Sequence, residues 1–261
     1  FVLKWGPEGR HTTAGEAKLG IAISGLDARL INLFLAEPAE GRVEQGNLYA
    51  DLELRIADMG DRIDARGRFG VDNLTIAGED WQMRGLSIGQ DLDISLDELD
   101  VLKINAAATV ATIDGQNAVR LRHDGNGCFS TRDGTYTLTL KELNRNVVNA
   151  LPPKWRRDVR CRHLIVAGKL TATSTNGGRT LFSEGFLQVP WLQIVDLEYG
   201  PLAPSQVDLK WRLTFEDGQL NIKVLHLNAA SGALRTADLD VQGRIALPFD
   251  RGKSVLEINS E

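Results

Sequence analysis

The segment Asn47-Leu-Tyr-Ala-Asp-Leu-Glu-Leu-Arg-Ile56 decides the fold. Apolar and polar residues alternate along most of it, so that Leu52 and Leu54 share one face and Asp51 lies on the other. Successive side chains of a strand point to opposite faces. The alternation therefore predicts a β-strand with one apolar face shielded from water (the dry face) and one polar face toward solvent (the wet face). One dry face and one wet face are typical of antiparallel sheets.

The same alternation recurs along the chain, and Asx-Gly pairs separate the alternating runs. In the clearest hairpin, Val207–Phe215 leads into the turn Asp217-Gly218, and Leu220–Leu227 returns. Asx-Gly tolerates the positive φ values that tight hairpins need. We predict an all-β fold, an elongated and curled antiparallel sheet that forms a groove. A β-sandwich is the alternative, because alternation fixes only which face is dry.

A larger module occurs twice, and each copy is an apolar helical run, a proline break and an alternating strand. The apolar spacing predicts short helices over Leu26–Ala36, before Pro38, and over Leu140–Leu151, before Pro152. Repetition of this kind is typical of arrays in which each unit covers the apolar surface of its neighbour. We therefore predict two β modules, 1–139 and 140–261, each with one of the helices.

Composition excludes several classes of protein. The chain has 261 residues, of which 43% are hydrophobic and 25% charged, as expected for a folded domain. The net charge of -5 argues against nucleic-acid binding, which usually requires a basic excess. No apolar run approaches the ~18 residues of a membrane-spanning helix, and no signal peptide is visible. Because the chain begins at Phe1 without a methionine, we expect a piece of a longer protein.

Motifs of known chemistry are missing from the sequence. It contains neither the G-x-S-x-G motif of hydrolases nor the H-E-x-x-H motif of zinc proteases. A glycosidase acting through Asp93 and Asp97 is the enzymatic alternative, but alternation places both carboxylates on the wet face of a strand. We predict no enzymatic activity, no cofactor and no metal.

The two cysteines leave three possibilities open. His123, Cys128, Cys161 and His163 could supply four zinc ligands, although their spacing is unlike that of known zinc motifs. An oxidising compartment would allow a disulfide between the cysteines. We favour two unpaired, partly buried thiols.

A basic patch with an aromatic residue follows the second helical run. Trp155, Arg156 and Arg157 are residue types that suit the interface with anionic lipid headgroups. The alternative is a solvated helix end, where positive charge complements the helix dipole.

Several segments of the sequence resemble one known family. The motif Leu-Pro-Pro-x-Trp-Arg at 151–156 and the strand Leu-Ile-Val-Ala-Gly-Lys-Leu-Thr-Ala at 164–172 resemble the repeats of the AsmA-like family of Gram-negative envelope proteins, TamB-like proteins included. The segments 32–38, 46–54 and 67–76 are similar to the same repeat. The resemblance covers most of the chain.

The resemblance implies a periplasmic segment of a protein that an N-terminal helix anchors in the inner membrane. It also implies an apolar β-groove that carries phospholipid acyl chains, with no catalytic residues. The dry strand faces supply the candidate lining residues, which are Leu48, Leu52, Leu54, Leu209, Trp211 and Leu213. The alternative function is a structural or assembly module of the envelope that binds a protein partner.

Overall fold

The structure is a computed structural model of the chain. The structure describes residues 17–33, 41–79, 81–151, 159–196, 200–201, 205–231, 234–246 and 255–260. Most of these residues form antiparallel strands, so the predicted all-β fold is confirmed. The chain divides into two units. Unit 1 extends to Gly115 and includes His123–Ser130, and unit 2 comprises Gln116–Arg122 and the chain from Thr131 onward. The predicted module boundary at residue 139 rests on the sequence repeat and stays a prediction.

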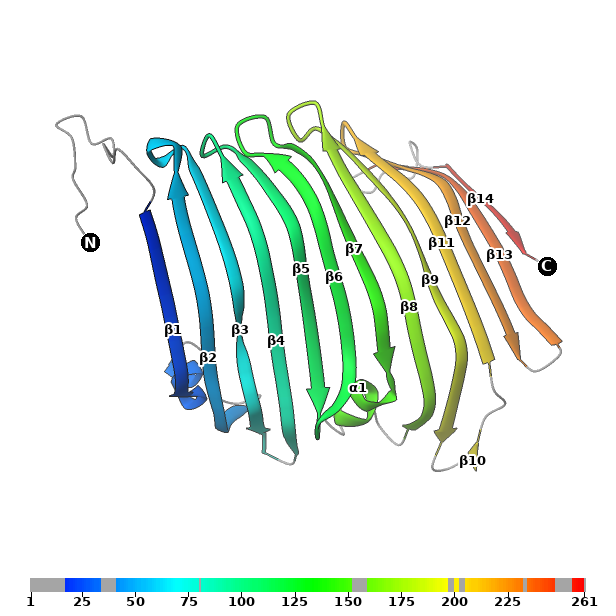
Figure 1. The fold of residues 1–261 in the computed structure, drawn as a ribbon. Coiled ribbons are helices and arrows are strands. Elements are labelled where there is room, and N and C mark those ends of the chain that lie inside the picture. The colour runs from blue at the N-terminus through cyan, green and yellow to red at the C-terminus, as the bar shows by residue number, and fades with distance from the viewer. Residues whose placement is uncertain are drawn as a thin grey trace. The chain divides into compact units, whose positions relative to one another are not determined.

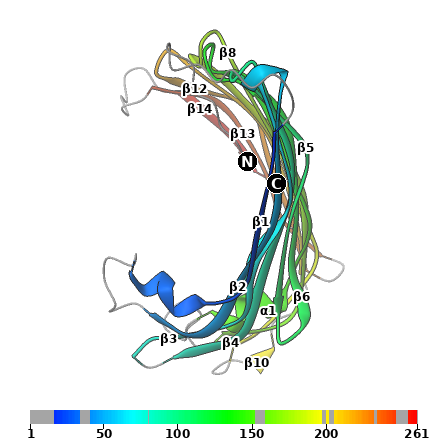
Figure 2. The ribbon, with the colours of Figure 1, turned by 60° about the vertical axis from the view of Figure 1, so that its left-hand side comes forward.

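Unit 1 is a curved sheet in which every strand pairs with its neighbour in sequence (Figure 1). Its strands are β1 (Ala17–Asp27), β2 (Arg42–Ala57), β3 (Arg62–Ala77), β4 (Gln82–Asp97) and β5 (Val101–Ile113). The 3₁₀ helix η1 (Ala28–Leu33) follows β1, and the single turn η3 (Asp58–Gly60) connects β2 to β3. The long strands bend along their length, and η1, the blue helix in Figure 2, lies on their concave side. Strand β6 (Gln116–Cys128) contributes residues to both units.

Unit 2 is also an antiparallel sheet of sequence neighbours. Its strands are β7 (Asp133–Asn144), β8 (Val159–Thr175), β9 (Thr180–Asp196), β11 (Ser205–Glu216), β12 (Gln219–Ser231), β13 (Leu234–Ala246) and β14 (Val255–Ser260). The helix α1 (Arg145–Ala150) lies between β7 and β8, and the short β10 (Gly200–Pro201) pairs with the end of β9.

The described strands form a single sheet layer in each unit. A β-sandwich needs a second sheet against the apolar face, and within each unit all described strands belong to one hydrogen-bonded sheet. Among the described residues no large side chain is fully buried, as the filled core of a sandwich would require. The curled sheet is therefore confirmed over the sandwich alternative.

Both predicted helices are present, but their predicted bounds were wrong. The first helix covers only Ala28–Leu33, because Leu26 and Asp27 still belong to β1, and residues 34–36 lie outside the described part of the chain. The second begins at Arg145, because the run from Leu140 to Asn144 pairs with β8 as strand.

A bulge explains why the second helix was predicted too early. The register of β7 against β8 shifts between Leu140 and Leu143. Leu140 pairs with Gly168 and Leu143 with Val166, so β7 advances three residues where β8 advances two. Such a step imitates the three- and four-residue spacing of a helix. The helix itself starts where the side chain of Asn144 accepts a hydrogen bond from the backbone N–H of Asn146, at 3.0 Å.

Two strand glycines permit a backbone that other residues do not adopt. Gly67 in β3 has φ 136° and Gly243 in β13 has φ 145°. A Cβ atom at Gly67 would collide with the carbonyl oxygen of Asp51, and one at Gly243 with that of Val255. Glycines at such positions let neighbouring strands approach closely where a sheet bends.

Candidate functional site

One face of unit 1 is apolar across its five strands. Residues directly opposite one another in an antiparallel pair lie on the same face, so the register defines rows that cross the sheet. The row through Leu52 consists of Ile21, Leu52, Gly67, Leu92 and Ala107. The row through Leu54 consists of Leu19, Leu54, Ala65, Ile94 and Ile104. The row through Leu48 consists of Leu26, Leu48, Val71, Ile88 and Ala111.

The apolar face of unit 1 is largely uncovered. Leu19 is 45% exposed, Phe69 41% and Ile88 37%, and all three side chains lie on this face. A core side chain of a folded domain is usually almost completely buried. Contiguous exposed apolar surface on a folded protein is typical of a site that binds something else.

Helix η1 closes one end of this face. Ala28 is completely buried and packs with Val43 and Leu74, and Leu48 packs against the same cluster. Asn32 fastens the helix to β2: its Nδ2 donates to the carbonyl of Val43 at 2.8 Å, and its Oδ1 accepts from the backbone N–H of Val43 at 2.9 Å. Because η1 lies on the concave side of the strands, the apolar face of unit 1 is concave (Figure 2).

A polar row interrupts the same face. Gln90 and Thr109 are directly opposite each other, and their side chains are hydrogen bonded. The hydroxyl of Thr109 also lies 3.0 Å from Nε2 of His123. Phe69 is the partner of Gln90 on β3, so an exposed aromatic ring and three polar side chains occupy neighbouring positions.

The opposite face of unit 1 is charged. Arg66 pairs with Asp93 at 3.2 Å, and Asp97 pairs with Lys103 at 2.6 Å. The hydrogen bond from Lys103 is the main cause that lowers the pKa of Asp97 below its ordinary value. Asp93 and Asp97, the carboxylates of the glycosidase alternative, are thus each engaged by a cation on the polar face.

Unit 2 has an apolar face of the same construction. The row through Trp211 consists of Leu170, Gly185, Trp211, Leu225, Val241 and Ile258. The row through Leu209 consists of Gly168, Leu187, Leu209, Leu227, Leu239 and, at its β14 end, the polar Ser260. The row through Leu213 consists of Ala172, Ser183, Leu213, Ile222, Gly243 and Leu256. The six predicted lining residues therefore divide evenly between the two apolar faces.

Trp211 has a fixed place on the apolar face of unit 2. A Cβ atom at Gly185 would collide with its ring, so the ring covers this glycine. Its indole Nε1–H donates to the hydroxyl of Ser183 at 3.2 Å. The ring is therefore oriented by one hydrogen bond and one close packing contact, while its indole remains part of the apolar surface.

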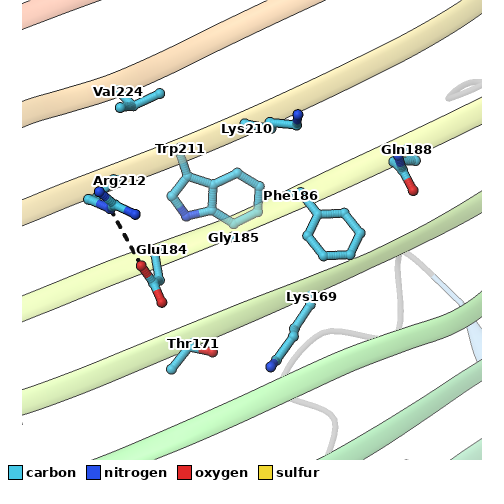
Figure 3. Close-up of a pocket in the computed structure, with 10 residues that line it drawn as sticks. All are labelled: Lys169, Thr171, Glu184, Gly185, Phe186, Gln188, Lys210, Trp211, Arg212 and Val224. Carbon is cyan, nitrogen blue, oxygen red and sulfur yellow. Dashed lines mark ion pairs between the residues drawn. The ribbon is translucent and has the colours of Figure 1, made fainter.

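The polar face of unit 2 carries a hollow that the alternation pattern did not predict. Phe186, which is 37% exposed, lies in register between Lys169 and Lys210, and the hollow has a volume of about 510 Å³. Arg212 and Glu184 border it and pair at 3.5 Å (Figure 3). Phe186 is an aromatic residue at a position of β9 where the alternation calls for a polar one. That irregularity is the sequence signal that could have identified the hollow.

The structure places the cysteines and their histidine neighbours in different units, with His123 and Cys128 in unit 1 and Cys161 and His163 in unit 2. Cys128 Sγ donates to Asp100 at 2.8 Å, whereas Cys161 Sγ lies 3.3 Å from the carbonyl of His163. Both thiols are free, and burial is the main cause that raises the pKa of Cys161. Within the described segments, one group of His, Cys, Asp or Glu side chains is close enough to share a metal ion. That group is His226, Asp238 and Asp240.

The headgroup candidates Trp155, Arg156 and Arg157 lie outside the described residues. In the part of the chain that is described, no helix has the length and apolarity needed to cross a bilayer. Comparison of the chain with models of protein families, with curated proteins and with solved structures found no match.

Proposed function

We propose that the chain is a non-enzymatic, lipid-binding segment that carries acyl chains along the apolar faces of its sheets. The observation that carries the proposal is the uncovered apolar face of unit 1, whose exposed side chains include Leu19, Ile23 and Phe69. Water contact with such a surface is unfavourable by about 25 cal/mol per Å² of apolar area. An occupant made of hydrocarbon would remove that contact without needing any specific polar partner.

The dimensions of the apolar rows suit an acyl chain. Neighbouring strands are about 4.8 Å apart, so a row across five strands is roughly 19 Å long. One lipid leaflet contributes about half of a hydrocarbon core of about 30 Å, which is about 15 Å per acyl chain. Each methylene that leaves water contributes about 0.8 kcal/mol, so partial burial of one chain suffices for measurable binding.

The openness of the surface favours transfer over permanent storage. Several side chains of the rows are exposed to solvent, Leu19, Ile88 and Ile258 among them. A bound chain would keep one side toward solvent or toward a second hydrophobic partner. Such an occupant can leave by sliding along the row, because no polar bond has to break.

The setting of this function is proposed from the sequence resemblance. A lipid-carrying groove in a periplasmic segment of an inner-membrane-anchored protein is what the AsmA-like resemblance implies. In this setting the ligand is phospholipid, and Trp155, Arg156 and Arg157 are the proposed headgroup contacts.

A second candidate function is supported by the sheet edges. Strand β1 pairs only with β2, and β14 pairs only with β13 among the described strands. Strand β14 is exposed along its whole length, with Ile258 62% exposed. An unpaired edge can accept a strand from another protein, so an envelope assembly module that binds a protein partner is the alternative.

Lipid analysis of the purified chain separates the two candidates. We expect native mass spectrometry of protein from a bacterial host to show phospholipid adducts, and solvent extraction to recover the same lipids. The protein should also withdraw a fluorescent phospholipid from vesicles. A chain that is empty after purification and takes up no lipid from vesicles would refute the lipid proposal and leave the protein-binding module as the better candidate.

A further inference from the structure

Three metal-ligating side chains meet on the polar face of unit 2. His226 on β12 and Asp240 on β13 are direct partners in register, and Asp238 is opposite Asn228 in the adjacent row. His226 Nδ1 lies 2.9 Å from an oxygen of Asp240 and 3.5 Å from an oxygen of Asp238. One nitrogen and two carboxylates from two strands therefore converge on a common point.

The separations fit a small tetrahedral ion. Zinc bonds to histidine nitrogen and carboxylate oxygen are about 2.0–2.2 Å long, which places tetrahedral ligand atoms about 3.4 Å apart. All three ligand atoms lie within 4.8 Å of one another. Small rotations of the two aspartate side chains would bring the set to zinc geometry without any change in strand register.

The surroundings also suit a cation. Nδ2 of Asn228 donates to the second oxygen of Asp238 at 3.3 Å, which orients that carboxylate as outer hydrogen bonds orient metal ligands. The side chain of His226 is 29% exposed and that of Asp240 52%, so an ion can enter from solvent. Lys210 on β11 is the direct partner of His226 and borders the hollow over β8, β9 and β11 (Figure 3), so the two carboxylates must also offset its charge.

We propose that His226, Asp238 and Asp240 bind one Zn²⁺ ion, with water as the fourth ligand, and that the ion clamps β12 to β13. His226 supplies Nδ1, and each aspartate supplies one oxygen. The two carboxylates balance the charge of the ion. This inference does not depend on lipid binding, because the site lies on the face opposite the apolar rows of unit 2.

Zinc titration of the full chain tests the proposal. Isothermal titration calorimetry of metal-free protein should show one zinc site, and zinc should raise the melting temperature. His226→Ala and Asp240→Asn should each weaken binding by at least about tenfold and remove the thermal shift. His163→Ala is the matched control, because it removes a histidine of the same unit that packs edge-on against Trp191 and lies outside the group of His226, Asp238 and Asp240. The control should bind zinc like the parent protein.

Two results would overturn the proposal. One is a parent protein that binds no zinc in the titration. The other is zinc binding that survives His226→Ala, which would assign the ion to the cysteines or to other histidines. Circular dichroism of each variant checks the strand content. If His226→Ala fails to fold, the isosteric Asp240→Asn decides the outcome.

Discussion

Replacing Leu213 by glutamate tests whether the apolar face of unit 2 is open. Leu213 is half-buried, between Ser183 on β9 and Ile222 on β12. Complete burial of a leucine side chain contributes about 1.5–3 kcal/mol, so loss of a half-buried one should cost about 1–2 kcal/mol. The new carboxylate stays hydrated on an open face and adds little to that cost. In a filled core the same change would leave an unpaired charge without water, at a cost of several kcal/mol more.

Chemical denaturation and a lipid displacement assay measure the two consequences. We expect Leu213→Glu to remain folded, with the midpoint of urea unfolding shifted modestly, and to lose binding of a fluorescent fatty acid. Gln206→Glu is the matched control, since it adds the same carboxylate on the polar side of the same strand. The reasoning is refuted if Leu213→Glu unfolds the protein outright, because the position would then be ordinary core. It is equally refuted if the folded variant binds the fatty acid unchanged.

Three further predictions concern the backbone, the thiols and pH. Gly67→Ala should destabilise the protein by at least about 1–3 kcal/mol in urea unfolding, because the positive φ and the tight strand contact both exclude a side chain. Cys161, buried and with a raised pKa, should react with a thiol reagent much more slowly than the half-buried Cys128, as labelling followed by mass spectrometry would show. The hydrogen bond from Lys103 lowers the pKa of Asp97 in the folded state. The ionised Asp97 should therefore stabilise the fold above its unfolded pKa of about 3.9, and this stabilisation should be lost as pH falls through the folded pKa.

Each of these predictions has its own control. Gly20→Ala adds a methyl group where no atom lies within 4 Å, so its stability should stay close to that of the parent. Equal labelling rates for the two cysteines would contradict the burial argument. For the pH prediction, Asp97→Asn should lower the stability of the protein at neutral pH, and the difference from the parent should vanish at strongly acidic pH. A difference that persists there would contradict the ion-pair explanation.

The faces of the strands could be predicted from the sequence, because they depend on a local pattern. Alternation around Leu52 and Leu213 is a property of a few consecutive residues, and the structure places both on apolar faces. The bounds of α1 could not be predicted in the same way. The bulge after Leu140 has no local signature and copies the spacing of a helix.

The meeting of His226 with Asp238 and Asp240 depends on register, which the sequence pattern leaves open. The pairing of β12 with β13 shifts between Ile222 and Leu225 and again between Ala229 and Ala230. Each shift changes which residues are directly opposite. Inspection of either strand alone therefore cannot show that the imidazole and the carboxylates share one point.

The order of the strands has a consequence for how the protein unfolds. Each described strand within a unit pairs with its nearest neighbours along the chain, and little of the structure is held together by side chains packed from a distant segment. Contacts of this kind make stability a sum of nearest-neighbour terms, as in a linear array. Such a sheet can fray from an edge inward, strand by strand, without loss of the pairs beyond. Exchange of backbone amide hydrogens should accordingly be fast at β1, slower at β2 and slower still at β3, a gradient unlike the uniform protection of a closed core.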